Sequence, residues 1–331
     1  MRTANNELLR QTLRQVMKLL QQVPQDQPGQ VKVLQDKYLD TLCEQLGMDL
    51  NPTQFVDSGY SFTDAGKAVS PLVAAMCAKE YMRVHQFQLG ILKAINERSQ
   101  PVRVLYAGTG PLGSLVLPLL LLLKPGQVRV TLLDIHQESL DSLKQILDLL
   151  NLWDFIDDLI LADAIHWQTE SRFDLIVSET MKAMLEQEPQ VRIFANLEQF
   201  LSPDGSLIPR AIELRAYFYQ RQGRHLAVTD LGPFFVLNRE TAELLRECQQ
   251  IQGQLRFPVN GVAERLELHT RIQIYDDIEL SGRQCSLNRI ECIPLNEALP
   301  SSAFDFRYAW GPEPRFEFTP VDLPNTAIGV R

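Results

Sequence analysis

The sequence contains few cysteines, and their spacing excludes the sites that cysteines usually build. Five of the 331 residues are cysteine, with no Cys-x-x-Cys pair and no cluster of cysteine with histidine. Zinc sites and disulfide frameworks both need such spacing, so we predict neither a bound metal nor a disulfide-stapled fold. We interpret the cysteines as reduced, mostly buried thiols of a cytoplasmic protein.

Long apolar runs and basic runs are also absent. The longest apolar run, residues 114–123, spans about ten residues and contains Pro118, whereas a bilayer-spanning helix needs roughly 20. The first residues read as a polar helix start and not as a signal peptide, so we expect no membrane partner. The chain carries 32 basic and 41 acidic residues, a net charge of −9. This balance argues against a nucleic-acid partner and suits a neutral or cationic substrate.

Alternating strand and helix patterns fill residues 98–209. Hydrophobic residues make up 45% of the chain, enough for a sizeable core. The patterns predict strands at 102–108, 128–135, 158–164 and 173–179, and helices at 114–123, 137–151 and 189–201. Apolar strands that alternate with helices indicate a parallel sheet covered on both faces, so we predict an α/β, Rossmann-like core.

The regions before and after this core have different patterns. Residues 1–97 predict three helices, the last of which runs from Pro71 toward the first strand, and we interpret them as a lid over the ligand site. Residues 210–331 alternate apolar and polar positions between turns, which indicates a β-rich domain, a sandwich or a barrel. One further helix is expected within it, at 239–251.

The stretch VRVLYAGTGPLG, residues 102–113, places three glycines between a strand and a helix. This order lets the backbone of Gly108, Thr109, Gly110 and Gly113 come close to a nucleotide-like ligand. A Cβ atom would hold the chain away from the ligand or oppose the positive φ angles of the turn. Such loops serve dinucleotides, S-adenosylmethionine and simple tight turns alike, so the loop alone does not choose among them.

Acidic residues end the second and third expected strands. Asp134, followed by Ile135, lies about 24 residues beyond the glycine loop, where a Rossmann-like unit holds the ribose hydroxyls of its ligand. Asp163, followed by Ala164, ends the third strand, where the adenine ring of such a ligand would lie. An acid at a strand end can also cap the next helix, and this alternative stays open for both.

The fourth expected strand leads into SETMKAMLEQE, residues 178–188. Here the sequence resembles the protein arginine methyltransferase family, whose double-E loop has matching residues at Ser178, Glu179, Met181, Leu185 and Glu188. The turn SPDGSLIP, residues 202–209, also matches the family's turn into its β-barrel. The resemblance implies a class I S-adenosylmethionine-dependent methyltransferase in which Glu179 and Glu188 hold the guanidino group of an arginine-type substrate.

The resemblance extends upstream of the glycine loop. In KEYMRVHQF, Glu80, Arg83 and Phe87 follow the family's spacing of an acid, an arginine and an aromatic residue. It implies that Arg83 binds the carboxylate of S-adenosylmethionine and that Glu80 is a third catalytic acid. It also implies a homodimer, with an arm that we place at 220–263. For Arg83 a salt-bridged helix arginine is the alternative, and for Glu188 a solvated helix start.

Physical chemistry gives the two glutamates a function. A guanidinium is planar, permanently charged and a poor nucleophile, because its lone pairs are delocalised. Two carboxylates can hold it by charge-assisted hydrogen bonds and localise a lone pair on one nitrogen, which then faces the electrophilic methyl group. Most of the rate would come from positioning and electrostatics. The expected reaction is N-methylation of a guanidino group on a small molecule or a peptide.

The sequence departs from the family at three points. Lys182 stands where the family has glycine, and Tyr106 where it has an acid before the glycine loop. The family's Thr-His-Trp motif is missing, since His269 and Thr270 occur in another order without the tryptophan. These differences argue against a histone-type protein substrate. Two alternatives stay open: methyl transfer to an amine, hydroxyl or carbon of a small molecule, and a non-catalytic cofactor-binding scaffold.

Overall fold

The core of the molecule is a five-stranded parallel sheet. The computed structural model describes residues 2–24, 27–50, 60–257, 262–295 and 303–321. The strands of the sheet, in spatial order, are β5 (Ile156–Leu161), β4 (Val128–Asp134), β3 (Val102–Ala107), β6 (Phe173–Ser178) and β7 (Leu201–Ile208). In chain order this is 3-2-1-4-5, the doubly wound arrangement of a Rossmann-like sheet. The predicted fold class is therefore confirmed, and the point where the strand order reverses lies between β3 and β6.

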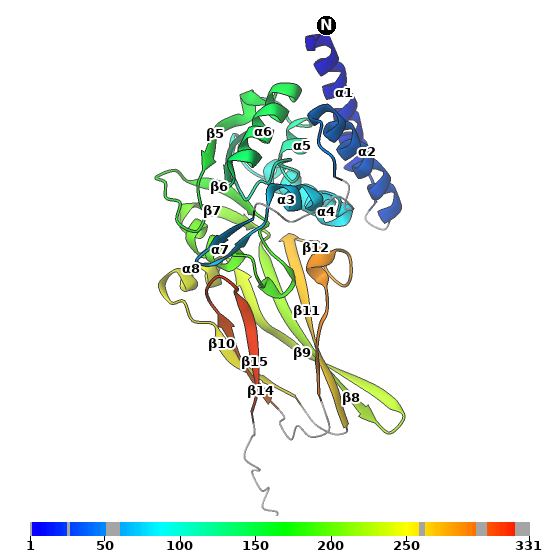
Figure 1. Cartoon of the computed structure of the whole chain (residues 1–331), viewed down its shortest axis with the longest axis vertical. Coiled ribbons are helices and arrows are strands. Elements are labelled where there is room, and N and C mark those ends of the chain that lie inside the picture. The colour runs from blue at the N-terminus through cyan, green and yellow to red at the C-terminus, as the bar shows by residue number, and fades with distance from the viewer. Residues whose placement is uncertain (1, 25–26, 51–59, 258–261, 296–302, 322–331) are drawn as a thin grey trace, which may run out of the picture.

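Helices cover both faces of this sheet. Helix α6 (Gln137–Leu150) buries a stripe of apolar residues at helical spacing, namely Leu140, Leu143, Ile146, Leu147 and Leu150. Helices α4 (Tyr81–Asn96) and α7 (Gln190–Leu197) follow the same rule, and Figure 1 shows them around the sheet. Helix α1 (Arg2–Leu20) packs against α5 and α6, and helix α2 (Pro28–Leu46) against α4 and α6. None of the described helices is long and apolar enough to cross a membrane.

The apolar run at 114–123 is not the helix that its hydrophobicity predicts. Only α5 (Leu117–Leu120) is helical, and the residues before it form turns in which Val116 N and Leu117 N donate to Gly113 O. Pro118 explains the difference, because it has no N–H to donate and its ring opposes a helical turn at the preceding residues. The carbonyl of Ser114 instead accepts from the Gln88 side chain on α4, at 2.8 Å.

Two further expectations for local structure are corrected. The helix predicted from Pro71 is broken into α3 (Pro71–Cys77) and α4, with Ala78–Glu80 between them. Of the segment predicted as a turn at 202–209, residues 202–208 belong to β7, which pairs in parallel with β6. Its register jumps by several residues between Phe173↔Leu201 and Leu175↔Ser206, so the Pro-Asp-Gly sequence forms a bulge inside a strand rather than a free turn.

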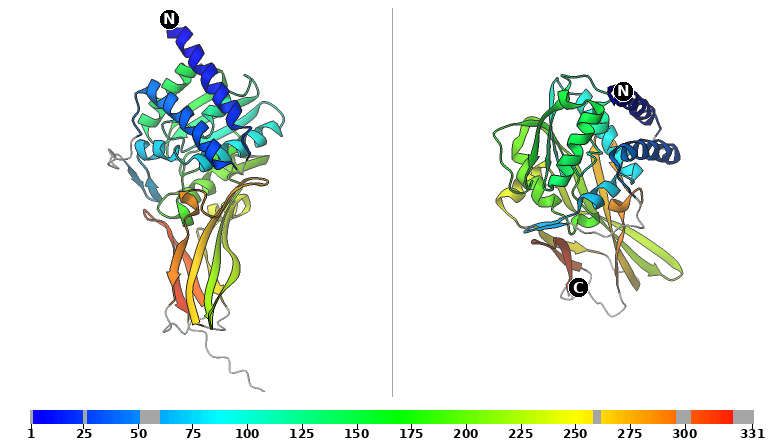
Figure 2. Two further views of the ribbon diagram at one scale, coloured as in Figure 1. Left: turned by 90° about the vertical axis from the view of Figure 1, so that its right-hand side faces the viewer. Right: turned by 45° about the horizontal axis from the view of Figure 1, so that its top comes forward.

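A short hairpin forms where the sequence predicts a loop-rich connection. Strands β1 (Ser61–Thr63) and β2 (Gly66–Ala68) pair antiparallel, and Thr63 Oγ1 accepts from Ala65 N and donates to Gly66 O across the turn. Residues 51–59 of that connection lie outside the described part of the chain. The hairpin reaches away from the N-terminal helices toward the β-rich half, as Figure 2 shows. It therefore comes close to residues far along the sequence.

The C-terminal part is β-rich, as predicted, and consists of two antiparallel sheets. One sheet has the order β12-β11-β8-β9 with β13 beside β11, and the other has the order β10-β14-β15. The elements are β8 (Ala211–Gln222), β9 (His225–Asn238), α8 (Arg239–Glu247), β10 (Gln252–Arg256), β11 (Val262–Tyr275), β12 (Ile278–Leu280), β13 (Glu291–Pro294), β14 (Ala303–Ala309) and β15 (Arg315–Val321). Phe234 of β9 lies 5.2 Å from Phe306 and 5.4 Å from Phe316, ring centre to ring centre, which joins the sheets through an aromatic cluster.

The predicted arm segment, 220–263, comprises the end of β8, β9, α8, β10 and the first two residues of β11. Helix α8 packs against α7 of the same chain, and Arg239 and Arg246 both lie within 3.3 Å of the Glu198 carboxylate. Residues 258–261 lie outside the described residues. Contact of this segment with a second copy stays a prediction.

Candidate active site

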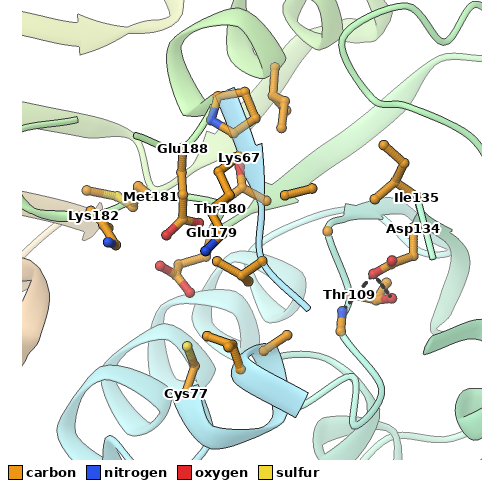
Figure 3. A pocket seen from close by; sticks show the side chains of 18 of the residues that line it. Lys67, Cys77, Thr109, Asp134, Ile135, Glu179, Thr180, Met181, Lys182 and Glu188 are labelled. Atoms are coloured by element: carbon orange, nitrogen blue, oxygen red, sulfur yellow. Dashed lines mark hydrogen bonds between the residues drawn. The ribbon is translucent and has the colours of Figure 1, made fainter. Parts of the chain in front are cut away.

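A cavity of about 410 Å³ opens at the carboxyl ends of the parallel strands, at the point where the strand order reverses. Ligands of doubly wound sheets bind at this position. Its wall includes these residues from the sequence-based set: Arg83, Gly108, Thr109, Gly110, Asp134, Ile135, Asp163, Ala164, Glu179 and Glu188. Glu80 and Gly113 are not part of the wall. In Figure 3, Asp134 and Ile135 lie at one end of the cavity and Glu179 and Glu188 at the other.

The Asp134 carboxylate ties the glycine loop to the end of β4. Its Oδ2 accepts from Thr109 Oγ1 at 3.1 Å and from Gly110 N at 2.8 Å, and its Oδ1 accepts from His136 N at 2.9 Å. The residue is 5% exposed, so these bonds replace water that the buried charge has lost. Asp134 therefore organises the loop, and Figure 3 shows its bond to Thr109 beside the cavity.

The glycines of the loop serve close packing within the protein. All three have positive φ, between 53° and 73°. A Cβ on Gly108 would lie 2.3 Å from Thr180 Cγ2, and one on Gly113 would lie 2.7 Å from Leu117 Cγ. Gly113 is thus required by the hydrophobic core and lies away from the cavity. The expectation that Gly113 approaches the ligand directly finds no support in its position.

Asp163 holds the turn that follows β5. Its Oδ1 accepts from Ile165 N at 2.9 Å, and its carbonyl accepts from the backbone N–H groups of His166 and Trp167. Both Asp163 and Ala164 line the cavity on the side of Asp134. Asp163 therefore both stabilises this turn and forms part of the cavity wall.

Arg83 is brought to Glu179 from 96 residues away in the sequence. The Arg83 guanidinium forms an ion pair with Glu179 and lies 3.4 Å from Glu80 Oε2, and the side chains of Arg83 and Glu179 are each 7% exposed. Burial opposes the charge on Arg83, yet its carboxylate partners raise its pKa well above the usual value. Arg83 therefore stays a cation inside the protein, with Glu80 supporting it from outside the cavity wall.

Glu179 and Glu188 form a partly neutralised acidic pair. Burial raises the pKa of Glu179 to about 7, with Arg83 opposing the rise and Glu188 adding to it. Burial also raises the pKa of Glu188, against the charges of Arg83, Lys182 and Lys67. Glu179 Oε1 is buried and has no hydrogen-bond partner among the described residues. Glu179 thus has a buried carboxylate oxygen at this end of the cavity that no described residue satisfies.

The double-E loop between the two glutamates has an unusual backbone. Met184, Leu185 and Gln187 have φ of 60°, 56° and 63°, the left-handed region that such residues rarely adopt. Each such residue costs on the order of 1–3 kcal/mol, so surrounding contacts must hold the loop in place.

The C-terminal sheets supply those contacts. Met184 N donates to Thr270 Oγ1 at 2.9 Å, Leu185 O accepts from Tyr308 Oη at 2.7 Å, and Gln187 N donates to Pro314 O at 2.7 Å. Thr270 points inward from β11, whereas His269 points to the other face and contacts Tyr217. The β-rich part thus shapes the loop that carries the glutamates.

Gln190 anchors the start of this loop, and sequence reasoning missed it. The side chain is fully buried, and its Oε1 accepts from Thr180 N at 2.8 Å and from Thr180 Oγ1 at 2.9 Å. Its Nε2 donates to Ser178 O at 3.3 Å. Gln190 thereby fixes both neighbours of Glu179. A lone glutamine at the start of a helix carries no signal of this role in the sequence.

The β1–β2 hairpin was also missed, and it roofs the cavity. Lys67 N donates to Gln187 O at 2.7 Å, and a Cβ on Gly66 would lie 2.9 Å from Pro189 N. At the other end, Ser61 Oγ lies 3.2 Å from His136 Nε2. The hairpin therefore spans from the end of β4 to the double-E loop. The turn sequence Thr-Asp-Ala-Gly is the signal that could have predicted it.

The cover over the cavity comes from residues 63–84 rather than from the first two helices. Thr63, Lys67, Ala74, Cys77 and Arg83 are among its lining residues, and no residue of α1 or α2 belongs to the described wall. Among the described residues, no cluster of three or more His, Cys, Asp or Glu could hold a metal ion.

Among the comparisons with known proteins, only the comparison with solved structures gives matches. No family model matches the sequence, and no curated protein matches it. Among solved structures, the chain is similar to the Trypanosoma brucei PRMT1 enzyme–prozyme heterotetrameric complex with AdoHcy. The sequence identity is 13% and the TM-score is 0.49, over 70% of this chain and 84% of that chain. A likeness at this level carries no argument about function.

Proposed function

We propose that the chain is a class I S-adenosylmethionine-dependent methyltransferase that N-methylates a guanidino group. The observation that supports this most is Glu179, whose side chain is 7% exposed and whose Oε1 lacks a partner among the described residues. A buried carboxylate oxygen without a partner is costly unless a ligand satisfies it. When both are ionised, Glu179 and Glu188 present acceptor groups only, which suits a planar cation with several N–H donors.

The rest of the cavity offers groups for S-adenosylmethionine, from Asp134 at the opposite end to Arg83 beside Glu179. Asp134 uses three of the roughly four acceptor positions of a carboxylate on its own chain, which leaves room for a ribose hydroxyl. Ser139 Oγ lines the cavity, is buried and has no partner among the described residues. Arg83 has five donors and uses two of them on Glu179 and Glu80, so others stay available for the cofactor carboxylate.

We call the end of the cavity formed by Glu179 and Glu188 the acceptor end, because its residues would hold and orient the nucleophile. Bound S-adenosylmethionine would supply an electrophilic methyl group to a guanidino nitrogen, with the carbon–sulfur electron pair left on sulfur and the proton lost from that nitrogen passing to solvent. Glu179 Oε1 and Glu188 bind the guanidinium N–H groups and concentrate electron density on the attacking nitrogen. Arg83 and Gln190 keep Glu179 in position.

Transfer of labelled methyl to a panel of guanidines, amines and phenols tests the proposal. We expect label on guanidines, and Glu188→Gln should lower kcat/KM by about 10- to 150-fold, the effect of losing a charge-assisted hydrogen bond. Glu247→Gln, at an exposed position of α8, is the matched control and should match the wild type. Label on amines or phenols but not on guanidines would favour the alternative function, methyl transfer to an amine, hydroxyl or carbon of a small molecule. Cofactor binding without any transfer would favour a non-catalytic scaffold.

A further inference from the structure

Besides Arg83, three cations line the same cavity as the two glutamates. Lys67 comes from the β1–β2 hairpin, Lys182 from the double-E loop and Arg289 from the residues just before β13. They converge here although the chain has a net charge of −9. Figure 3 places Lys182 beside Glu188, at the end of the cavity away from Asp134. The acceptor end is thus bipolar, with carboxylates and cations from separate segments.

The cations lie nearer to solvent than Glu179 does. The Arg289 side chain is 67% exposed and binds Glu291, with its Nε 2.8 Å from Glu291 Oε1. Lys182 is exposed, and its Nζ donates to Gln187 Oε1. A guanidinium has five donors and an ammonium three, so both can bind a further anion while they keep these contacts. Negative charge of a substrate would therefore be recognised at the rim, outside the glutamates.

The β1–β2 hairpin covers the acceptor end where it meets the double-E loop. Backbone of the hairpin lies directly on the double-E loop, through Lys67 N to Gln187 O at 2.7 Å and through Gly66 against Pro189. An arginine within an extended peptide would need chain to pass on both sides of its Cα. A free amino acid has a carboxylate at that position instead.

We propose that the acceptor is a small guanidino acid, such as free arginine, bound with its guanidinium on Glu179 and Glu188 and its carboxylate at Lys182 and Arg289, with Lys67 at the roof. This inference rests on the proposed function, since it names the substrate class of that same site. The chemistry is the methyl transfer given above, and the carboxylate takes no part in it. Its role is to select one class of guanidine among several.

The experiment compares L-arginine, agmatine and an arginine-containing peptide as acceptors. Agmatine keeps the guanidino group and the carbon chain of arginine but lacks the carboxylate. We expect wild-type kcat/KM for arginine to exceed that for agmatine and for the peptide by about tenfold or more. In Lys182→Gln and in Arg289→Gln, the ratio of arginine to agmatine should fall by about threefold to tenfold. Arg283→Gln, at an exposed position six residues before Arg289 in the sequence and outside the cavity wall, should keep the wild-type ratio.

The ratio within one variant is independent of how much of that variant folds. Equal or better use of agmatine or of the peptide by the wild type would overturn the guanidino-acid inference and leave the proposed function intact. An unchanged ratio in both Lys182→Gln and Arg289→Gln would overturn the assignment of these cations. Methylation of none of the three guanidines, with the cofactor bound, would overturn the proposed function itself.

Discussion

The two ends of the cavity differ in how their polar groups are held. At the Asp134 end, the carboxylate is satisfied by neighbours at two adjacent strand ends, Thr109, Gly110 and His136. At the Glu179 end, one carboxylate oxygen is unpartnered among the described residues, and the loop that follows contains left-handed residues. The geometry of the Asp134 end follows from the parallel sheet itself. The geometry of the Glu179 end depends on contacts from the hairpin and the C-terminal sheets.

This difference separates binding from chemistry. Under the proposed function, the preformed Asp134 end would bind the nucleoside part of the cofactor without rearrangement, and the Glu179 end, where burial raises the carboxyl pKa values, would bind the cationic acceptor. We therefore expect changes at the Asp134 end to act mainly on cofactor affinity. Changes at the Glu179 end should act mainly on methyl transfer.

The largest effect is expected from removing Glu179. Glu179→Ala should lower kcat/KM by more than about 100-fold, and it should reduce the free energy of unfolding by about 3–5 kcal/mol, because Arg83 would be left buried without its main partner. Urea unfolding and initial rates measure the two effects. The double variant Glu179→Leu/Arg83→Leu should regain most of the stability and none of the activity. Recovery of activity in the double variant would show that the pair is only structural.

A smaller effect is expected at the other end. Asp134→Ala should weaken S-adenosylhomocysteine binding by about 10- to 100-fold in calorimetry, since the charge-assisted bonds that shape the glycine loop are lost. At saturating cofactor, kcat should stay within about threefold of the wild type. A fall in kcat as large as the loss of affinity would contradict the separation of the two ends.

The pH dependence follows from the raised pKa of Glu179, about 7. The guanidinium of the substrate stays charged, so binding needs the ionised carboxylate, and protonation below pH 7 removes it. We expect kcat/KM for the acceptor to fall about tenfold per pH unit below 7 and to level off above it. Cofactor affinity, measured over the same range, should change far less. A flat profile between about pH 5 and pH 8 would contradict the assignment of Glu179.

The smallest effect is expected from the buried anchor Gln190. Gln190→Leu keeps the volume of the side chain but leaves Thr180 N and Ser178 O without their partner. We expect kcat to fall about 5- to 20-fold, with cofactor affinity within about twofold, because the loop loses its position but not its charges. Gln190→Glu, which keeps the acceptor toward Thr180, should recover part of the rate. Equal loss of cofactor affinity would assign Gln190 to the fold alone.

Local sequence predicts the Asp134 end well. The strands at 102 and 128 have clear apolar patterns, and the glycine loop and Asp134 follow them directly, so their proximity needs only the parallel sheet. The apolar run at 114–123 was predicted wrongly because hydrophobicity outweighed Pro118, whose effect on a helix is itself readable from the sequence.

The Glu179 end could be predicted only in part. The spacing from Glu179 to Glu188 selects these residues, but nothing local indicates that Arg83 pairs with Glu179 or that Thr270 and Tyr308 bind their loop. These contacts join segments far apart in the chain, and single-sequence periodicity carries no information about such pairs. The break at Ala78–Glu80, which lies between Cys77 and Arg83, likewise has no signal that we can identify.

The position of the transferred methyl group tests the central claim most directly. The wild-type protein, S-adenosylmethionine labelled with carbon-13 in its methyl group and free arginine would be incubated, and the product examined by NMR and mass spectrometry. We predict one labelled methyl on a guanidino nitrogen, at a rate that Glu188→Gln reduces by at least about tenfold. Label on the α-amino or carboxyl group, or transfer that Glu188→Gln leaves unchanged, would contradict the account.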